Sequence, residues 1–235
     1  MPMDGSDGQP NMAAIIPPNT HFSTMNMSAF FPAVVGDASD LGLQRCLDLL
    51  LADEQLLAEA ARRSYRHQLG FFKFVLMADD AGRCLRMHVW DSALPVQEDI
   101  HSHCAHFQSR VVLGSLSENA FDLVLGDSHS RFLYRFDALA GHSVAVTDGV
   151  TGVCLRERRT LSRGDTYSKQ ASDLHSVSDA VQGTVTVSAW DSRHSEALVL
   201  KSRGAQPEDC AASAGMPVGE MRMALLNVKE RIDRR

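Results

Sequence analysis

The chain has 235 residues, of which 44% are hydrophobic and 22% are charged, and its formal net charge is -6. This composition is typical of one folded unit with a sizeable core, or of one unit and a smaller appendage. The negative balance argues against a nucleic-acid partner, because phosphate contacts need clustered lysine and arginine. No apolar run reaches the length of a membrane span, and the N-terminus lacks a secretory pattern, so we expect no membrane partner.

The number and spacing of the cysteines indicate the cellular compartment. The chain contains five cysteines with no C-x-x-C pair: Cys46, Cys84, Cys104, Cys154 and Cys210. An odd, scattered set suits a reducing environment better than a disulfide framework. We therefore expect a cytoplasmic protein.

The chain begins with an irregular segment and then turns helical. Residues 1–38 are rich in Pro, Gly, Asn, Ser and Met without a steady period, which predicts a poorly ordered arm. Apolar residues then recur at spacings of three and four from Asp40, and again from Asp53 to Arg63. Asp40 and Asp53 are the expected N-caps of these two helices.

The middle of the chain predicts strands. The segments from Phe71 to Met77 and from Cys84 to Trp90 flank a turn signal at 78–82 and form a predicted hairpin. Further short candidates follow at 101–116, 119–125, 131–136, 142–147, 152–159, 166–168, 175–178, 184–190 and 197–201. Such spacing predicts an all-β sandwich or barrel. The two helices and this barrel together span 39–203. The remaining residues, 204–235, form a tail in which Val218 to Ile232 predicts an amphipathic helix.

A His-x-His pair carries most of the functional information. In an extended strand, side chains two apart point to the same face, so His101 and His103 would direct two imidazoles at one point. His175 is the candidate third ligand. Three imidazoles suit Fe(II), Ni(II), copper or zinc.

The spacing around these histidines resembles that of the cupins. After the His101-Ser102-His103 pair comes Gly114, and ten residues separate Gly164 from His175, as in the two cupin motifs. The turn positions of the second motif hold Gln and Ser rather than Pro and Gly. The resemblance implies a double-stranded β-helix, or jelly-roll barrel, with the three histidines as metal ligands.

One cupin ligand is missing. The position of the usual glutamate falls on Phe107, or on Gln108 with the longer motif spacing. Three histidines without a glutamate are similar to the thiol dioxygenases typified by cysteine dioxygenase. The helices before the barrel and the Tyr-Arg segment ending at Arg66 add to this resemblance, which covers about 40–200.

The thiol dioxygenase resemblance implies roles for several side chains. Arg66 would bind a substrate carboxylate, although an arginine at the end of an arginine-rich helix is usually solvated. Gln108 is a candidate to hydrogen-bond substrate or dioxygen at the vacant position, and Tyr167 is a candidate to orient substrate. Each also has a plain structural interpretation, as a polar strand residue or as packing.

A metal held by neutral ligands keeps its full dication charge, which favours an anionic donor such as a thiolate. We therefore expect a mononuclear non-haem oxygenase, with Fe(II) or else Ni(II) or another divalent metal, that uses dioxygen to oxidise a small thiol amino acid such as L-cysteine. The segment inserted around 126–149 departs from the family pattern, as does the lack of a crosslinking cysteine after the histidine pair. These departures are compatible with a biosynthetic variant that rearranges or decarboxylates its product.

Two other functions remain open. One is a cupin dioxygenase acting on a non-thiol substrate, such as a diketone or a phenolic carboxylate. The other is a metal-dependent isomerase or a ligand-binding cupin without oxygen chemistry. In each case we expect a homodimer.

Overall fold

The structure is a computed structural model that describes residues 26–67, 71–92, 98–137, 142–210 and 214–234. Four α-helices are present in these ranges: α1 (Met27–Gly36), α2 (Leu41–Ala52), α3 (Glu54–Arg63) and α4 (Val218–Asp233). The strands are β1 (Tyr65–Arg66), β2 (Phe72–Ala78), β3 (Cys84–Trp90), β4 (Ile100–His101), β5 (Phe107–Leu113), β6 (Ser115–Asp137), β7 (His142–Ser162), β8 (Thr166–Lys169), β9 (Leu174–Ser178), β10 (Thr184–Trp190) and β11 (Ala197–Ser202). A short 3₁₀ helix covers Pro207–Cys210. No helix in these ranges is long and apolar enough to cross a membrane.

The strands form two antiparallel sheets. One has the order β1-β2-β3-β10-β5-β8, and the other has the order β11-β4-β9-β6-β7. From β3 to β6 and again from β7 to β10 the chain alternates between the sheets, and β3 pairs with β10, β4 with β9, β5 with β8 and β6 with β7. A chain that folds back on itself in this nested way is a double-stranded β-helix. The expected jelly-roll fold, with helices at both ends, is confirmed.

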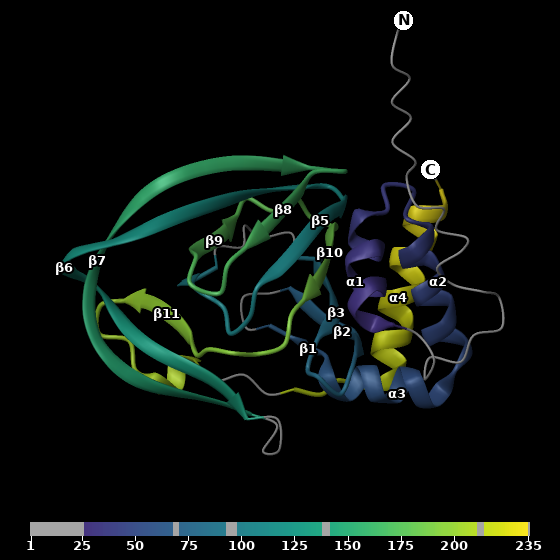
Figure 1. Cartoon of the computed structure of the whole chain (residues 1–235), viewed down its shortest axis with the longest axis horizontal. Coiled ribbons are helices and arrows are strands. Elements are labelled where there is room, and N and C mark those ends of the chain that lie inside the picture. Colours follow the sequence, from purple (N-terminus) through teal and green to yellow (C-terminus); the bar gives the residue numbers. More distant parts are fainter. Residues whose placement is uncertain (1–25, 68–70, 93–97, 138–141, 211–213, 235) are drawn as a thin grey trace, which may run out of the picture.

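The two faces of the six-stranded sheet have different roles. Its outer face is covered by the helices, which lie on one side of the barrel in Figure 1. Odd-numbered residues of β3, such as Leu85 and Met87, are fully buried in this helix-covered core. Even-numbered residues, such as Arg86 and Trp90, face the space between the sheets and line its cavity. The period-two pattern of β3 therefore separates the core from the site.

The N-terminal segment is more ordered than its composition predicts. Residues 1–25 lie outside the described residues, but Met27–Gly36 forms α1 despite the internal Pro32. Phe30 and Phe31 of this helix are 1% and 2% exposed, and α1 packs on β10 and β5. Burial of these aromatic rings stabilises a helix that lacks a regular charged face.

Only one of the two expected N-caps is confirmed. Asp53 accepts hydrogen bonds from the backbone nitrogens of Gln55 and Leu56 at the start of α3. Asp40 precedes α2 but adopts a left-handed conformation with φ of 64° and makes no cap hydrogen bond. Its carboxylate instead lies 2.7 Å from the buried guanidinium of Arg110. Pairing with Arg110 replaces capping as the role of this aspartate.

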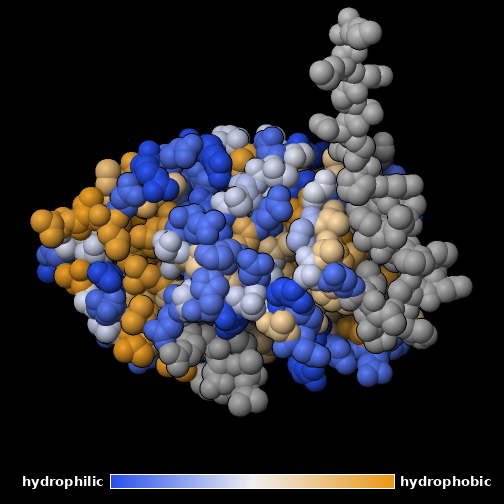
Figure 2. All heavy atoms as spheres, viewed as in Figure 1, coloured by the Kyte–Doolittle hydropathy of each residue, from blue (hydrophilic) through white to orange (hydrophobic). Residues whose placement is uncertain are grey.

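The region predicted as four short strands is one long β6–β7 ribbon. Its two strands have 23 and 21 residues and pair along almost their whole length. The ribbon curves around the end of the molecule opposite the helices (Figure 1), and this end carries a group of apolar side chains (Figure 2). The exposed apolar residues there include Leu123, Leu125, Val144, Val146 and Leu155. The segment inserted relative to the cupin pattern is the outer part of this ribbon.

Candidate metal centre

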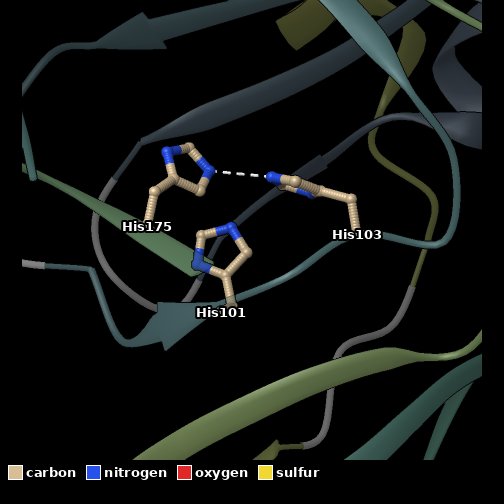
Figure 3. A group of neighbouring side chains, drawn as sticks. All are labelled: His101, His103 and His175. Atoms are coloured by element: carbon tan, nitrogen blue, oxygen red, sulfur yellow. Dashed lines mark hydrogen bonds between the residues drawn. The ribbon is translucent and has the colours of Figure 1, made fainter. Parts of the chain in front are cut away.

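Three histidines converge between the sheets. His101 ends β4, His103 follows in the next loop, and His175 lies on β9 directly opposite His101. One nitrogen from each ring lies within 4.8 Å of the others, and Nε2 of His103 is 2.7 Å from Nε2 of His175. Figure 3 shows the three rings turned toward one point. The sequence-based triad is therefore assembled by the fold.

Backbone pairing keeps His103 on the same side as His101 although β4 has ended. Ser102 between them is buried and exchanges hydrogen bonds of 2.8 and 2.9 Å with the backbone of Leu198. The N–H of His103 donates to the carbonyl of Ala171 at 2.9 Å. These bonds preserve the alternation of an extended chain, and so the two imidazoles share a face.

Neighbouring acceptors select which nitrogen is available in two of the three rings, those of His101 and His175. Nδ1 of His101 lies 2.8 Å from the backbone carbonyl of Asp99, which can only accept a hydrogen bond. The proton of His101 is therefore on Nδ1, and Nε2 keeps its lone pair. Nδ1 of His175 faces Oε1 of Glu118 at 3.5 Å, so the same tautomer is favoured there.

Glu118 belongs to a buried charged group behind His175. Its carboxylate is 1% exposed, contacts the Lys169 ammonium and accepts a 2.7 Å hydrogen bond from Nε of Arg159. Burial alone would raise the pKa of Glu118, but hydrogen bonding to His175 and Lys169 outweighs burial and lowers it to about 2. The carboxylate is ionised at neutral pH and fixed in place.

The three imidazoles are neutral at pH 7. Burial lowers the pKa of His101 to about 3 and lowers the pKa values of His103 and His175 as well. Neutral imidazole is the form that binds metals, because the ligating nitrogen must carry a lone pair. Convergence, tautomer and neutrality together fit a divalent transition metal held on one face by three nitrogens.

The vacant glutamate position is occupied by Phe107. Its ring stacks on Trp190 with centroids 4.2 Å apart and meets the His103 ring edge-on at 4.8 Å. Gln108 is exposed and does not line the cavity, since alternation along β5 turns it to the opposite face. The expected hydrogen-bonding role of Gln108 is therefore not supported by its position. Among the described residues, β5 contributes no further ligand to the triad.

Of the other two predicted site residues, Tyr167 lies in the cavity wall and Arg66 does not. Tyr167 is buried, lines the cavity and hydrogen-bonds Ser109; burial raises the pKa of its phenol to about 12. Arg66 instead makes two hydrogen bonds of 3.0 and 2.7 Å to the carboxylate of Asp91 and is outside the cavity lining. The structure brings Tyr167 to the site and pairs Arg66 elsewhere.

Arg86 is a cavity residue that sequence reasoning missed. It is 7% exposed, and its guanidinium carbon lies 3.9 Å from the centre of the Trp190 ring, whose edge meets His103. Nε of Arg86 lies 3.2 Å from Sγ of Cys84, and no described carboxylate lies within 4.0 Å of its guanidinium. A buried cation without an acidic partner can bind an anion. The alternation of polar and apolar residues along β3 was the available signal.

The sequence matches no protein-family model and no curated protein. Solved structures similar to this chain include a hydroquinone 1,2-dioxygenase in complex with Cd²⁺ and 4-hydroxybenzonitrile, with 12% identity and a TM-score of 0.32 over 50% of this chain and 61% of that chain. Another is an uncharacterised protein with a double-stranded β-helix domain from Klebsiella pneumoniae, with 9% identity and a TM-score of 0.35 over 62% of this chain and 95% of that one. A third is oxalate oxidase, with 14% identity and a TM-score of 0.34 over 72% and 73%. Because these similarities are low, we assign the fold from the strand pairing described above. We propose an activity only from the geometry of the site.

Proposed function

We propose that this protein is a mononuclear non-haem metal-dependent oxygenase that uses dioxygen to oxidise the sulfur of a small thiol amino acid such as L-cysteine. The observation that carries the proposal is the set of three neutral, converging imidazoles without a carboxylate ligand, beside a buried arginine that lacks an acidic partner. Fe(II) is the proposed metal, and Ni(II) or another divalent metal fits the same nitrogens.

His101, His103 and His175 would hold the metal through one nitrogen each. When bound, Fe(II) would supply a Lewis acid and a redox centre that lets dioxygen react with the sulfur. Three neutral ligands leave the dication charge uncompensated, which favours a thiolate next to it. A site with a carboxylate ligand would have one positive charge less and would favour a thiolate less strongly.

Cationic side chains in the cavity support an anionic substrate. Arg86 presents a fork of N–H donors that matches a carboxylate, and stacking on Trp190 fixes the plane of this fork. Lys73 also lines the cavity, and its charge lowers the pKa values of His101 and His103. We assign the substrate carboxylate to Arg86, in the role that the family resemblance gave to Arg66.

The surrounding residues position the substrate and exclude water. Phe107 and Trp190 cover one side of His103 with stacked rings. Tyr167 keeps its proton at neutral pH and can donate a hydrogen bond to a developing oxygen on sulfur. The overall reaction adds both atoms of dioxygen to the thiol and gives the sulfinic acid, so that sulfur is oxidised, dioxygen is reduced, and no further reductant is consumed.

The cell compartment and oligomeric state form part of the same proposal. The four cysteines whose side chains are described are all free, which supports a reducing compartment such as the cytoplasm. The exposed apolar side chains of the β6–β7 ribbon, at the end of the molecule opposite the helices, support a homodimer. Sedimentation velocity on the full chain tests the dimer, and a monomer at micromolar concentration would contradict it.

Oxygen uptake against a substrate panel tests the activity. Protein loaded with Fe(II) without air is mixed with L-cysteine, cysteamine, L-serine or a phenolic carboxylate, and then exposed to oxygen. We expect uptake with L-cysteine, one dioxygen per thiol consumed, and none with L-serine. Uptake only with the phenolic acid, or with no compound, would overturn the thiol assignment.

A further inference from the structure

The cavity continues beyond the triad to a second group of rings. It has a volume of about 1130 Å³ and is also lined by side chains of β3 and of the segment just before β2. Phe71 stacks on His67 with centroids 4.6 Å apart and on Trp90 at 5.4 Å, and it meets the His88 ring edge-on at 5.6 Å. We call these four residues the aromatic wall. The proposed thiol chemistry does not use them.

Two polar atoms in the aromatic wall lack partners. Nε1 of Trp90 and Nε2 of His88 are buried, and no hydrogen-bond partner for either is found among the described residues. Trp90 as a whole is 2% exposed. A buried donor without an acceptor is costly, and such an atom in a cavity wall is satisfied by a ligand or by an ordered water. The wall therefore offers two unused hydrogen-bonding positions.

The chemistry of these atoms limits what can satisfy them. The indole N–H is only a donor, whereas a neutral imidazole nitrogen donates or accepts according to its tautomer. Burial lowers the pKa of His88 well below its usual value, so this ring is neutral at pH 7. A flat enclosure with one donor and one adaptable nitrogen suits a planar, uncharged group with an acceptor oxygen, such as an amide.

The size of the cavity agrees with a larger ligand than a free amino acid. Pockets that enclose drug-sized molecules have volumes of roughly 300–1,000 Å³, and a single cysteine is much smaller than such molecules. The wall and the triad line the same cavity, which is bordered by His67, His88 and Trp90 as well as by the three histidines of the triad. One ligand can therefore occupy both regions.

We propose that the aromatic wall is a second subsite that binds an amide group, so that the preferred thiol substrate is a cysteine held in a peptide and free cysteine is a weaker one. This inference rests on the proposed function for the identity of the thiol. The subsite itself is defined by His88 and Trp90, whose unpaired ring nitrogens would hydrogen-bond the amide.

Binding to the metal-free protein tests the subsite separately from the chemistry. L-serine, Ser-Gly-Gly and Gly-Gly-Ser replace the thiol by a hydroxyl, and their dissociation constants are measured by calorimetry. We expect at least one tripeptide to bind about tenfold more tightly than L-serine. Trp90→Phe keeps a ring but removes the N–H, so it should weaken that tripeptide about three- to tenfold and leave L-serine unchanged. His88→Phe should act in the same direction.

Thermal denaturation of each variant shows that it is folded before the affinities are compared. Equal affinities of the wild-type protein for L-serine and both tripeptides would overturn the inference, as would tripeptide binding that Trp90→Phe and His88→Phe leave intact. If tripeptides bind as expected but no thiol supports oxygen uptake, the proposed oxygenase function fails and the subsite stands. If free cysteine is oxidised but the tripeptides bind no more tightly than L-serine, the subsite fails and the proposed oxygenase function stands.

Discussion

Glu118 of β6 and His175 of β9 face each other behind the metal-binding side of the triad, with Oε1 of the glutamate 3.5 Å from Nδ1 of the histidine. Ala120, two residues from Glu118, is the register partner of His175, so the sheet itself sets this approach. A buried, ionised carboxylate at this position favours the proton on Nδ1 and leaves Nε2 free. The chain supplies this carboxylate to support a ligand, and not as a fourth ligand.

Removing the charge of Glu118 should weaken metal binding. Glu118→Gln keeps the shape of the side chain but no longer selects the His175 tautomer, and such changes typically cost 10–100-fold in metal affinity. Competition with a chelator measures the affinity. Glu157→Gln on the exposed face of β7 is the matched control and should leave the affinity unchanged. Equal affinities for Glu118→Gln and the wild-type protein would show that the carboxylate plays no part in the site.

Arg86 should determine recognition of the substrate carboxylate. Arg86→Met removes charge-assisted hydrogen bonds, so we expect kcat/KM for L-cysteine to fall about 10- to 100-fold. Cysteamine has the same thiol and amine but no carboxylate, and its kcat/KM should not change. Arg66→Met, which breaks only the exposed pair with Asp91, should leave both substrates unaffected. A cysteine-specific loss in Arg66→Met, and none in Arg86→Met, would reverse the assignment.

The metal-free protein should lose stability in mild acid. Burial lowers the pKa of His67 to about 4 and that of His101 to about 3, whereas unfolded histidines titrate near pH 6.5. Between about pH 6.5 and 4 the unfolded chain therefore binds more protons than the folded one, and the free energy of unfolding falls as the pH falls. The same direction holds for His88, His103 and His175.

Glu98 opposes this trend. Burial raises the pKa of its carboxyl group to about 7, so the folded state retains a proton that the unfolded chain releases near pH 4.5. Five imidazoles outweigh one carboxyl group, and we expect the urea midpoint to be lower at pH 5 than at pH 7. Glu98→Gln should make the decrease steeper. A midpoint that is unchanged or higher at pH 5 would contradict the burial of neutral histidines.

The first helix should contribute to global stability. Phe31 of α1 is 2% exposed and belongs to the core between the helices and the six-stranded sheet. Phe31→Ala should lower the free energy of unfolding by about 3–5 kcal/mol, as expected when a buried ring is replaced by a methyl group. Ser28→Ala on the exposed side of the same helix is the control. Chemical denaturation measures both, and a loss below about 1 kcal/mol for Phe31→Ala would mean that α1 is not part of the folded core.

The metal-binding triad could be predicted because its signal is local. Two ligands lie two residues apart, and the third follows a glycine at the spacing of a known motif, so no knowledge of the sheets is needed. The bounds of β3 and β10 were predicted for a similar reason, since alternation over seven residues is a strong pattern. Both signals depend on neighbours in the sequence.

The partners of Glu118 and Arg86 could not be found in this way. Glu118 meets His175 through the pairing of β6 with β9, and Arg86 meets Trp190 through the pairing of β3 with β10. The register of such a pair cannot be predicted from the sequence of either strand alone. The orientation of Gln108 could not be predicted by counting residues from His103 along an extended strand. The chain is irregular between His103 and β5, so Phe107 and not Gln108 takes the inward position. The α1 helix was missed because burial of Phe30 and Phe31 outweighs the composition around Pro32.

Oxygen uptake by the Fe(II)-loaded protein, compared with His175→Ala, tests the central claim most directly. The wild-type protein should bind about one iron per chain and consume one dioxygen per thiol with L-cysteine or a cysteine peptide, with the sulfinic acid as product. His175→Ala should lose both iron and uptake, while His129→Ala, on β6 outside the cavity lining, should retain both. Full uptake in His175→Ala, or an iron-loaded wild-type protein that consumes no oxygen with any thiol, would contradict the account.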